Sequence, residues 1–235
     1  MLCLKTKDFF LLIFVLAIFM PFFVFGQVMQ TYILLNTHYG LLISFIKFAV
    51  LATLGEVIGL RIKTGQYSQP GFGILPRALV WGVLGITIQM AFVIFSTGTP
   101  VFLEYAGMKG VAGLPADAGL TWLQVFVAFS ISMAMNLIYA PVMMTLHKIT
   151  DTHIEMTGGT LRGLFTAVRV GDIMANINWR VQWSFVFKKT IPLFWIPAHT
   201  ITFLLPEAYR VLFAALLGIM LGVILAVAAV MGKQN

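Results

Sequence analysis

The stretch LFWIPAHTITFLLPEAYR, residues 193–210, decides how the chain is interpreted. It is apolar enough to enter a bilayer, yet Pro197 and His199 lie inside it and Pro206 ends its apolar part. A proline within a helix removes one backbone donor and leaves the carbonyl four residues earlier, here that of Leu193, without its usual partner. In lipid, that carbonyl needs a partner from another helix, a hydroxyl group or water. We therefore predict that this segment faces protein or a polar cavity rather than lipid.

The composition of the whole chain predicts an integral membrane protein. Of its 235 residues, 60% are hydrophobic and 10% are charged, and the mean hydropathy is +0.97. Soluble domains are about 45–50% apolar and about 25% charged. The net charge is +7. Basic loops on one side of a membrane explain this charge better than a nucleic-acid-binding surface does. We expect no nucleic-acid-binding module. The single Cys3 excludes an internal disulfide framework, and we expect no cofactor.

Six apolar runs predict an all-α, polytopic bundle of about six transmembrane helices, in a single membrane domain covering residues 1–235. Each helix needs about 20 apolar residues to cross the hydrocarbon. The first run also fits a signal peptide, because Lys5 and Lys7 precede it and Val24-Phe25-Gly26 is a passable cleavage site, so that residues 1–26 would be removed. We favour an uncleaved span, because the run is long and contains Pro21. The predicted spans are residues 9–25, 40–60, 74–95, 121–146, 190–206 and 211–230.

Basic residues are concentrated in alternate connecting segments. Lys5 and Lys7, the segments 61–77 and 148–189, and the C-terminal Lys233 hold most of them, whereas residues 26–39 hold none. By the positive-inside rule, both termini face the cytoplasm or an organelle matrix, and the membrane is the inner membrane if the chain is bacterial. Within the basic segment 148–189, residues 160–179 mix apolar and basic side chains. This mixture predicts an amphipathic helix that lies among the lipid headgroups on the inner side.

Polar side chains within the predicted spans are candidates for a pore or polar path. Ionisable groups in hydrocarbon are costly and typically face a cavity or a partner. Lys47 and Glu56 lie nine residues apart on opposite sides of one helix, so they cannot pair with each other. We hypothesise that Glu56, Asn136 and His199 line one polar cavity; the alternative is interhelical hydrogen bonding alone. The candidate path comprises Lys47, Glu56, Gln89, Asn136 and His199.

Small residues repeat every four positions along the last apolar run, at Ala214, Gly218, Gly222 and Ala226. Such a stripe lets two helix backbones approach closely. We expect it to pack within the chain. The alternative is a homo-oligomer that forms through Gly218 and Gly222.

Signals for an enzyme are weak. His147 and Asp151 lie four residues apart, with His153 and Glu155 close by, so a metal ion could bind on one helix face. We favour a solvated loop for this cluster, and we predict no metal and no catalytic residue. The sequence contains no H-E-x-x-H motif, no Gly-rich phosphate loop and no G-x-S-x-G motif.

Three groups of residues occur in a recognisable order: Gly55-Glu56, then Asn136-Leu137 with Tyr139-Ala140-Pro141, then Trp195, Pro197, Phe203, Pro206 and Arg210. In these groups the chain, from about His38 to its C-terminus, resembles the Mpv-seventeen / twenty-two-kilodalton peroxisomal membrane protein family. It departs from the family pattern at Glu56 and Asn136, where the family has aspartate, and at Ile196, which separates the tryptophan from the proline. The resemblance implies a channel-like role in the weakly selective passage of small solutes.

We therefore expect a channel-like or transport pathway for small polar or anionic solutes, surrounded by membrane lipids. Lys47, Arg61 and Arg77 would favour anions. The alternative is a non-transporting scaffold that organises lipids or partner proteins. A membrane-bound hydrolase or transferase that uses residues 147–155 is the least favoured interpretation.

Overall fold

The computed structural model describes residues 6–114 and 120–231, with side chains described up to residue 224. Cys3, Lys5, Lys233 and the side chain of Ala226, which enter the sequence analysis, lie outside this part of the chain. The described residues form helices and connecting turns and contain no strand. The predicted fold class, an all-α polytopic membrane bundle, is confirmed.

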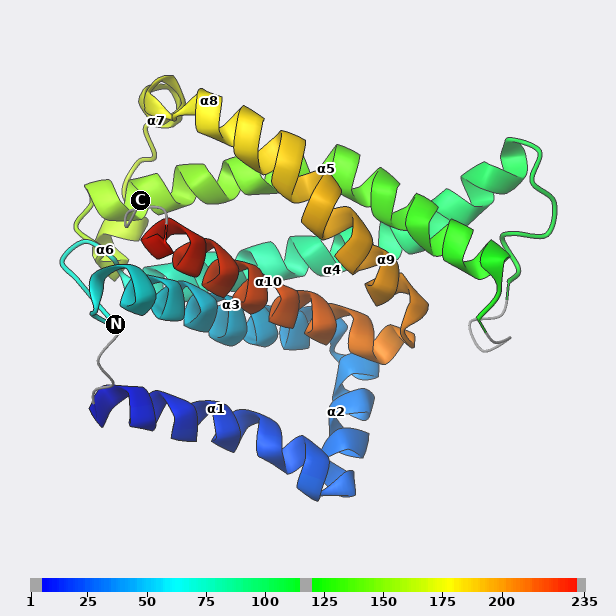
Figure 1. Ribbon diagram of the computed structural model, residues 1–235, viewed down its shortest axis with the longest axis horizontal. Helices are drawn as coiled ribbons and strands as arrows, with labels where there is room; N and C mark the ends of the chain where they lie inside the picture. The colour runs from blue at the N-terminus through cyan, green and yellow to red at the C-terminus, as the bar shows by residue number, and fades with distance from the viewer. Residues whose placement is uncertain (1–5, 115–119, 232–235) are drawn as a thin grey trace.

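Five helices in the described chain are long and apolar enough to cross a membrane. They are α1 (Thr6–Val24), α3 (Gly40–Thr64), α4 (Ile74–Tyr105), α5 (Trp122–Met156) and α10 (Glu207–Met231). The predicted fifth span, residues 190–206, is part of a continuous helical segment made of α8 (Trp179–Val181), the π-helix η1 (Gln182–Trp195) and α9 (Ile196–Leu204). These six segments run along the length of the molecule, and α1 begins at the same end of the bundle as α10 finishes (Figure 1).

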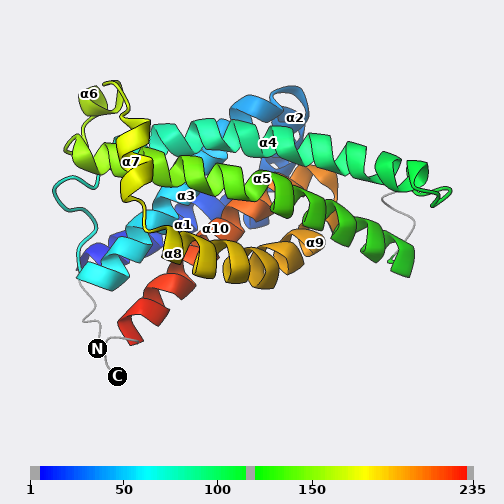
Figure 2. The same cartoon turned by 90° about the horizontal axis from the view of Figure 1, so that it is seen from above.

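The connection between the first two spans is also helical. α2 (Gly26–His38) lies across the end of the bundle opposite to the termini (Figure 1). α4 and α5 both continue beyond their predicted ends and run side by side (Figure 2). The hydrophobic core is shared by α3, α4, α5, α9 and α10, with residues such as Phe48, Phe92, Met135 and Ala215 buried at their contacts.

The backbone around Pro197 departs from a regular α-helix. The N–H of Ile196 donates to the carbonyl of Ile191, five residues earlier, so the chain is in π-helical register up to the proline. Pro197 then stands in the first turn of α9, where a missing N–H costs little. The sequence predicted that the carbonyl of Leu193 would lack its usual hydrogen-bond donor and need one from another helix, a hydroxyl group or water. The carbonyl that a neighbouring helix reaches is that of Ile196, which accepts a hydrogen bond from the Ser132 hydroxyl of α5 at 2.7 Å.

Glycines allow α3 to pack closely against two neighbours. A Cβ atom at Gly85 of α4 would lie 2.7 Å from the carbonyl oxygen of Ser44 in α3. A Cβ atom at Gly55 would lie 3.0 Å from the Cα of Ile219 in α10, and one at Gly222 would lie 3.4 Å from the Gly55 carbonyl oxygen. Gly222, one half of the proposed oligomer contact, therefore packs within the chain.

Two predictions about the segment 148–189 are wrong. Residues 148–156 are not a loop, because α5 continues until Gly158 and Gly159 end it with φ angles of +75° and +68°. Residues 160–179 are not one interfacial helix; they form α6 (Leu161–Leu164), α7 (Val170–Asn176) and the start of α8. Side-chain caps mark the starts of two of these helices, because Thr160 accepts from the N–H of Gly163 at α6 and Asn178 accepts from the N–H of Val181 at α8.

Candidate functional site

A cavity of about 510 Å³ lies among α3, α4, α5, η1–α9 and α10. It begins at Lys63 and Lys148, near the end of the bundle at which α1 starts, and extends inward to Phe92 and His199. Lining residues on α3 run from Phe48 to Lys63, a distance of about 22 Å at the helical rise of 1.5 Å per residue. The hydrocarbon of a bilayer is about 30 Å thick. The cavity therefore covers most of the depth that a spanning helix crosses.

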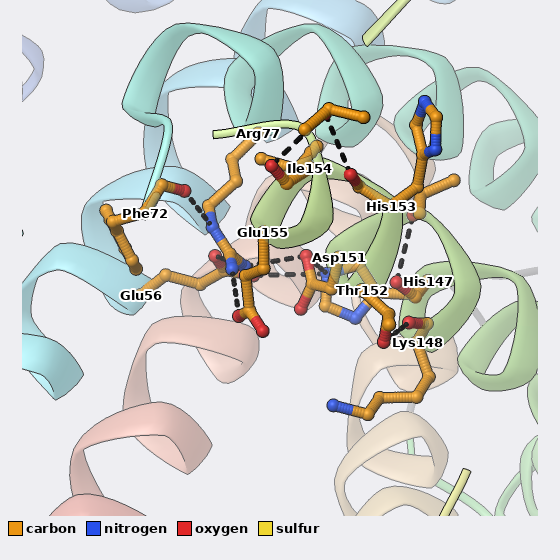
Figure 3. Close-up of polar contacts among 12 residues, drawn as sticks. Glu56, Phe72, Arg77, His147, Lys148, Asp151, Thr152, His153, Ile154 and Glu155 are labelled. Carbon is orange, nitrogen blue, oxygen red and sulfur yellow. Dashed lines mark hydrogen bonds and ion pairs between the residues drawn. The ribbon is translucent and has the colours of Figure 1, made fainter. Parts of the chain in front are cut away.

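The charged part of the cavity is organised around Arg77 in the first turn of α4 (Figure 3). Its Nη1 donates to Glu56 Oε2 at 2.7 Å and to Asp151 Oδ1 at 2.6 Å, and its Nη2 donates to Glu155 Oε1 at 2.9 Å. Its Nε donates to the carbonyl of Phe72 at 2.7 Å, and the guanidinium lies 4.6 Å from the centre of the Phe72 ring. Every nitrogen of this buried cation thus has a partner.

His147 completes the cluster on the cavity side. Its Nε2 lies 3.1 Å from Glu56 Oε1 and 3.5 Å from Asp151 Oδ1. The Glu56 Oε1 atom also accepts from Trp81 Nε1 at 2.8 Å, and the Trp81 and His147 rings are 4.3 Å apart. The side chains of Glu56, His147 and Asp151 are 19%, 21% and 17% exposed, so water and small ions can reach them from the cavity.

The length of α5 creates this cluster. His147, Asp151 and Glu155 are spaced by four residues, and side chains at this spacing lie on one helix face. The sequence analysis placed them in a solvated loop, and that interpretation is wrong. The available signal was the absence of a helix-ending glycine before Gly158.

The inner part of the cavity is polar but neutral. Asn136, which is fully buried on α5, donates through Nδ2 to the Ser132 carbonyl at 2.9 Å. His199 Nδ1 lies 3.0 Å from Asn136 Nδ2 and 3.2 Å from Asn136 Oδ1. The His199 ring contacts Phe92 and Trp195, with centroids 5.7 Å and 5.0 Å away. This part offers hydrogen-bonding groups between aromatic walls.

An aromatic pair marks the inner end of the cavity. The rings of Phe92 and Phe203 are 5.0 Å apart, and both residues are buried. Arg210 of α10 lies over the Phe203 ring at 5.8 Å and donates to the Leu205 carbonyl at 2.9 Å. The chain between α9 and α10 is thereby held against the aromatic pair.

The five candidate path residues separate into two groups. Glu56, Asn136 and His199 line the cavity, whereas Lys47 and Gln89 are not among its described lining residues. Lys47 Nζ donates to Asn36 Oδ1 of α2 at 2.8 Å, and Gln89 Oε1 accepts from the Ser44 hydroxyl at 3.0 Å. Lys47 and Gln89 therefore join helices outside the cavity.

The basis for an anion preference does not hold in the structure. Arg61 pairs with Asp8 of α1 through Nε at 2.8 Å and Nη2 at 2.7 Å, outside the described cavity lining. Asp8 also accepts from the Tyr67 hydroxyl; burial raises the pKa of Tyr67, and this hydrogen bond adds to the rise. Lys47 has polar partners on α2, and Arg77 is surrounded by three carboxylates. Arg61 and Arg77 are paired with carboxylates, and Lys47, whose described partners are neutral, lies outside the described cavity lining.

Several residues of the family-like pattern line the cavity, namely Gly55, Glu56, Asn136, Tyr139, Ala140 and Trp195. Tyr139 was not a candidate, yet its hydroxyl lies 2.7 Å from the Thr87 hydroxyl of α4. Trp81 was also missed, because its role depends on Glu56 from another helix. Pro141 lies inside α5, and Pro206 precedes α10. No protein-family model, no curated protein and no solved structure matches the chain.

Proposed function

We propose that the protein is a membrane transport protein and that the cavity is the path for small polar solutes. The observation that carries this proposal is a cavity of about 510 Å³ inside the spanning helices, with polar side chains along its length. Cavities of this size, with a few convergent polar groups, are typical of small-molecule sites. We also propose the relationship to the Mpv-seventeen / twenty-two-kilodalton family, since residues of the shared pattern line the cavity.

The order of groups along the cavity supports a preference for polar rather than purely anionic solutes. A solute would first pass the exposed Lys63 and Lys148, then the carboxylates of Glu56 and Asp151, then the neutral inner part. Cations at the mouth attract anions, and the carboxylates behind them oppose anions. Neutral or zwitterionic solutes meet the smallest barrier along this order.

The aromatic pair at the inner end of the cavity supports access from one side. Phe92 lines the inner end of the cavity, and it packs against Phe203 in the hydrophobic core. Transport would then need these rings to separate, as gating elements do in other transport proteins. We propose that the open end faces the cytoplasm or matrix, where the basic segments belong by the positive-inside rule.

Gly218 offers a direct test, because it lines the cavity and a Cβ atom there would meet nothing within 4 Å. Gly218→Phe would obstruct the cavity, and its Cβ atom would meet no neighbouring helix. The full chain is reconstituted in liposomes, and the uptake of small polar solutes is followed by light scattering during osmotic swelling. We expect uptake above that of empty liposomes for the natural sequence, and a fall to the empty-liposome rate for Gly218→Phe.

The matched control is Gly98→Phe, at an exposed α4 glycine that also has open space around it. Its uptake should equal that of the natural sequence. Folded protein without uptake for any small polar solute would overturn the proposal and favour a scaffold. Equal uptake in both variants would show that solutes do not pass through this cavity.

A further inference from the structure

We infer that Glu56, His147 and Asp151 form a binding site for a divalent transition-metal ion. The inference goes beyond the proposed transport function, because an ion can bind here whether or not solutes cross the membrane. The three side chains come from α3 and α5 and meet at the wall of the cavity (Figure 3). Among the described residues, their candidate ligand atoms all lie within 4.8 Å of one another.

The spacing of the donor atoms matches a metal site. Zn²⁺ binds imidazole nitrogen and carboxylate oxygen at about 2.0–2.2 Å in a tetrahedron, so neighbouring ligand atoms lie about 3.3 Å apart. His147 Nε2 lies 3.1 Å from Glu56 Oε1 and 3.5 Å from Asp151 Oδ1. The oxygens of Glu56 and Asp151 lie within 4.8 Å of each other. An ion among the three atoms would draw these oxygens together, on the side of Asp151 Oδ1 that faces away from Arg77 Nη1.

The charge of the cluster favours a divalent cation. Glu56, Asp151 and Glu155 carry three negative charges, and Arg77 supplies one positive charge. Metal binding requires the neutral imidazole of His147, and in that state the three carboxylates exceed Arg77 by two negative charges. Glu56 and Asp151 are partly buried, whereas Glu155 is exposed. Partly buried charges are costly unless they are paired or bind a metal. A divalent ion beside His147 supplies the missing charge.

Neighbouring groups hold the ligands in place. Trp81 Nε1 donates to Glu56 Oε1, and Arg77 donates to the second oxygen of Glu56 and to Asp151. Such outer partners orient metal ligands in known sites. The cavity beside the cluster provides an entry route and room for a fourth ligand from solvent. One imidazole and two carboxylates suit Zn²⁺, Fe²⁺, Ni²⁺ or Mn²⁺ rather than metals that prefer sulfur.

Calorimetric titration with Zn²⁺ tests the inference on the full chain, purified in detergent and stripped with a chelator. We expect one ion per chain, and we expect His147→Gln to lose this binding. The control is His38→Gln, because His38 is exposed on α2 and bonds only the Leu34 carbonyl of its own helix among the contacts described. Trp81→Phe removes an outer partner and should weaken binding by about 10–100-fold.

X-ray absorption of the zinc-loaded natural protein keeps the inference testable if His147→Gln does not fold. We expect nitrogen and oxygen ligands at about 2.0–2.1 Å with the outer scattering of one imidazole. The absence of saturable binding, equal binding in His147→Gln, or a spectrum without one imidazole would each overturn the inference. Binding is measured at equilibrium without a transport assay, so its failure is distinct from a failure of solute uptake.

Discussion

At the scale of single residues, Asn136 and His199 show how a polar pair is accommodated inside the bundle. Both were candidates for a polar path from their positions in apolar runs. The structure shows that each is the partner of the other, across α5 and α9. A buried amide that keeps its hydrogen bonds is tolerated, whereas one that loses them is costly. The pair therefore serves packing as well as the cavity wall.

A double-mutant cycle tests this pair. We expect Asn136→Ala to lower the free energy of unfolding by about 1–3 kcal/mol, because it leaves the buried His199 without its partner. Combining it with His199→Ala should give a coupling energy of about 0.6–1.7 kcal/mol, the range found between helices in membranes. Unfolding in mixed SDS micelles measures each value. Asn176→Ala, at an exposed position of α7, is the control, and additive losses would contradict the pairing.

The ion pair of Asp8 with Arg61 gives a second prediction at this scale. Asp8→Asn removes the charge that faces a guanidinium whose side chain is 8% exposed. A two-point contact between arginine and carboxylate is among the strongest polar contacts in proteins. We expect a clear fall in the SDS fraction needed for half unfolding. Asp172→Asn is the control, because its Arg169 partner is 73% exposed and such pairs contribute little. Equal falls for both variants would contradict the prediction.

At the scale of elements, the π-helix explains how a segment with Pro192 and Pro197 stays helical. Bonds to the fifth residue shift the register, so a proline ring does not have to fit against the carbonyl of a regular α-turn. The sequence revealed the prolines, but the register depends on contacts with α5. The hydroxyl of Ser132 that reaches the Ile196 carbonyl is one such contact.

Glycine replacements test the packing of whole helices. Gly85→Ala places a Cβ atom 2.7 Å from the Ser44 carbonyl, so α3 and α4 must separate. Overpacking costs about 1–3 kcal/mol, against a gain of about 0.8–1 kcal/mol in helix propensity. We expect a lower melting temperature, by about 2–4 °C per kcal/mol of net loss.

Gly218→Ala is the matched replacement, because its Cβ atom meets nothing within 4 Å. Only the gain in helix propensity applies there, so the melting temperature should stay the same or rise. Thermal unfolding in detergent measures both variants. Equal shifts for Gly85→Ala and Gly218→Ala would contradict the close approach of α3 and α4.

At the scale of the whole molecule, the direction of the helices predicts which loops share a compartment. The start of α1, the end of α10 and α7 lie at one end of the bundle, and the end of α4 and the start of α5 lie at the other (Figure 1). In a Cys3→Ser background, Lys109→Cys should react with an impermeant thiol reagent on intact cells. Arg169→Cys should react only after permeabilisation, by the positive-inside rule. Both residues are exposed, and labelling of both in intact cells would contradict this topology.

Much of the fold was predictable because the bilayer imposes it. Apolar runs such as 40–60 and 74–95 had to be helices, since only a helix satisfies every backbone group of one segment in lipid. The predicted ends were less accurate. α5 continues to Met156, since nothing in its sequence stops it before Gly158, and a hydropathy argument measures the width of the bilayer rather than the length of a helix.

The sequence by itself determined the membrane class, the helical architecture and the residues Glu56, Asn136 and His199 as candidates, because lipid permits few structures and few polar groups. Only the tertiary structure decided that His147, Asp151 and Arg77 surround Glu56. Along the sequence, His147 lies 91 residues from Glu56, and Arg77 lies 21 residues from it. Asp151 lies 74 residues from Arg77. Such contacts arise from the packing of three helices. The pattern of one helix contains no information about which face of another it meets.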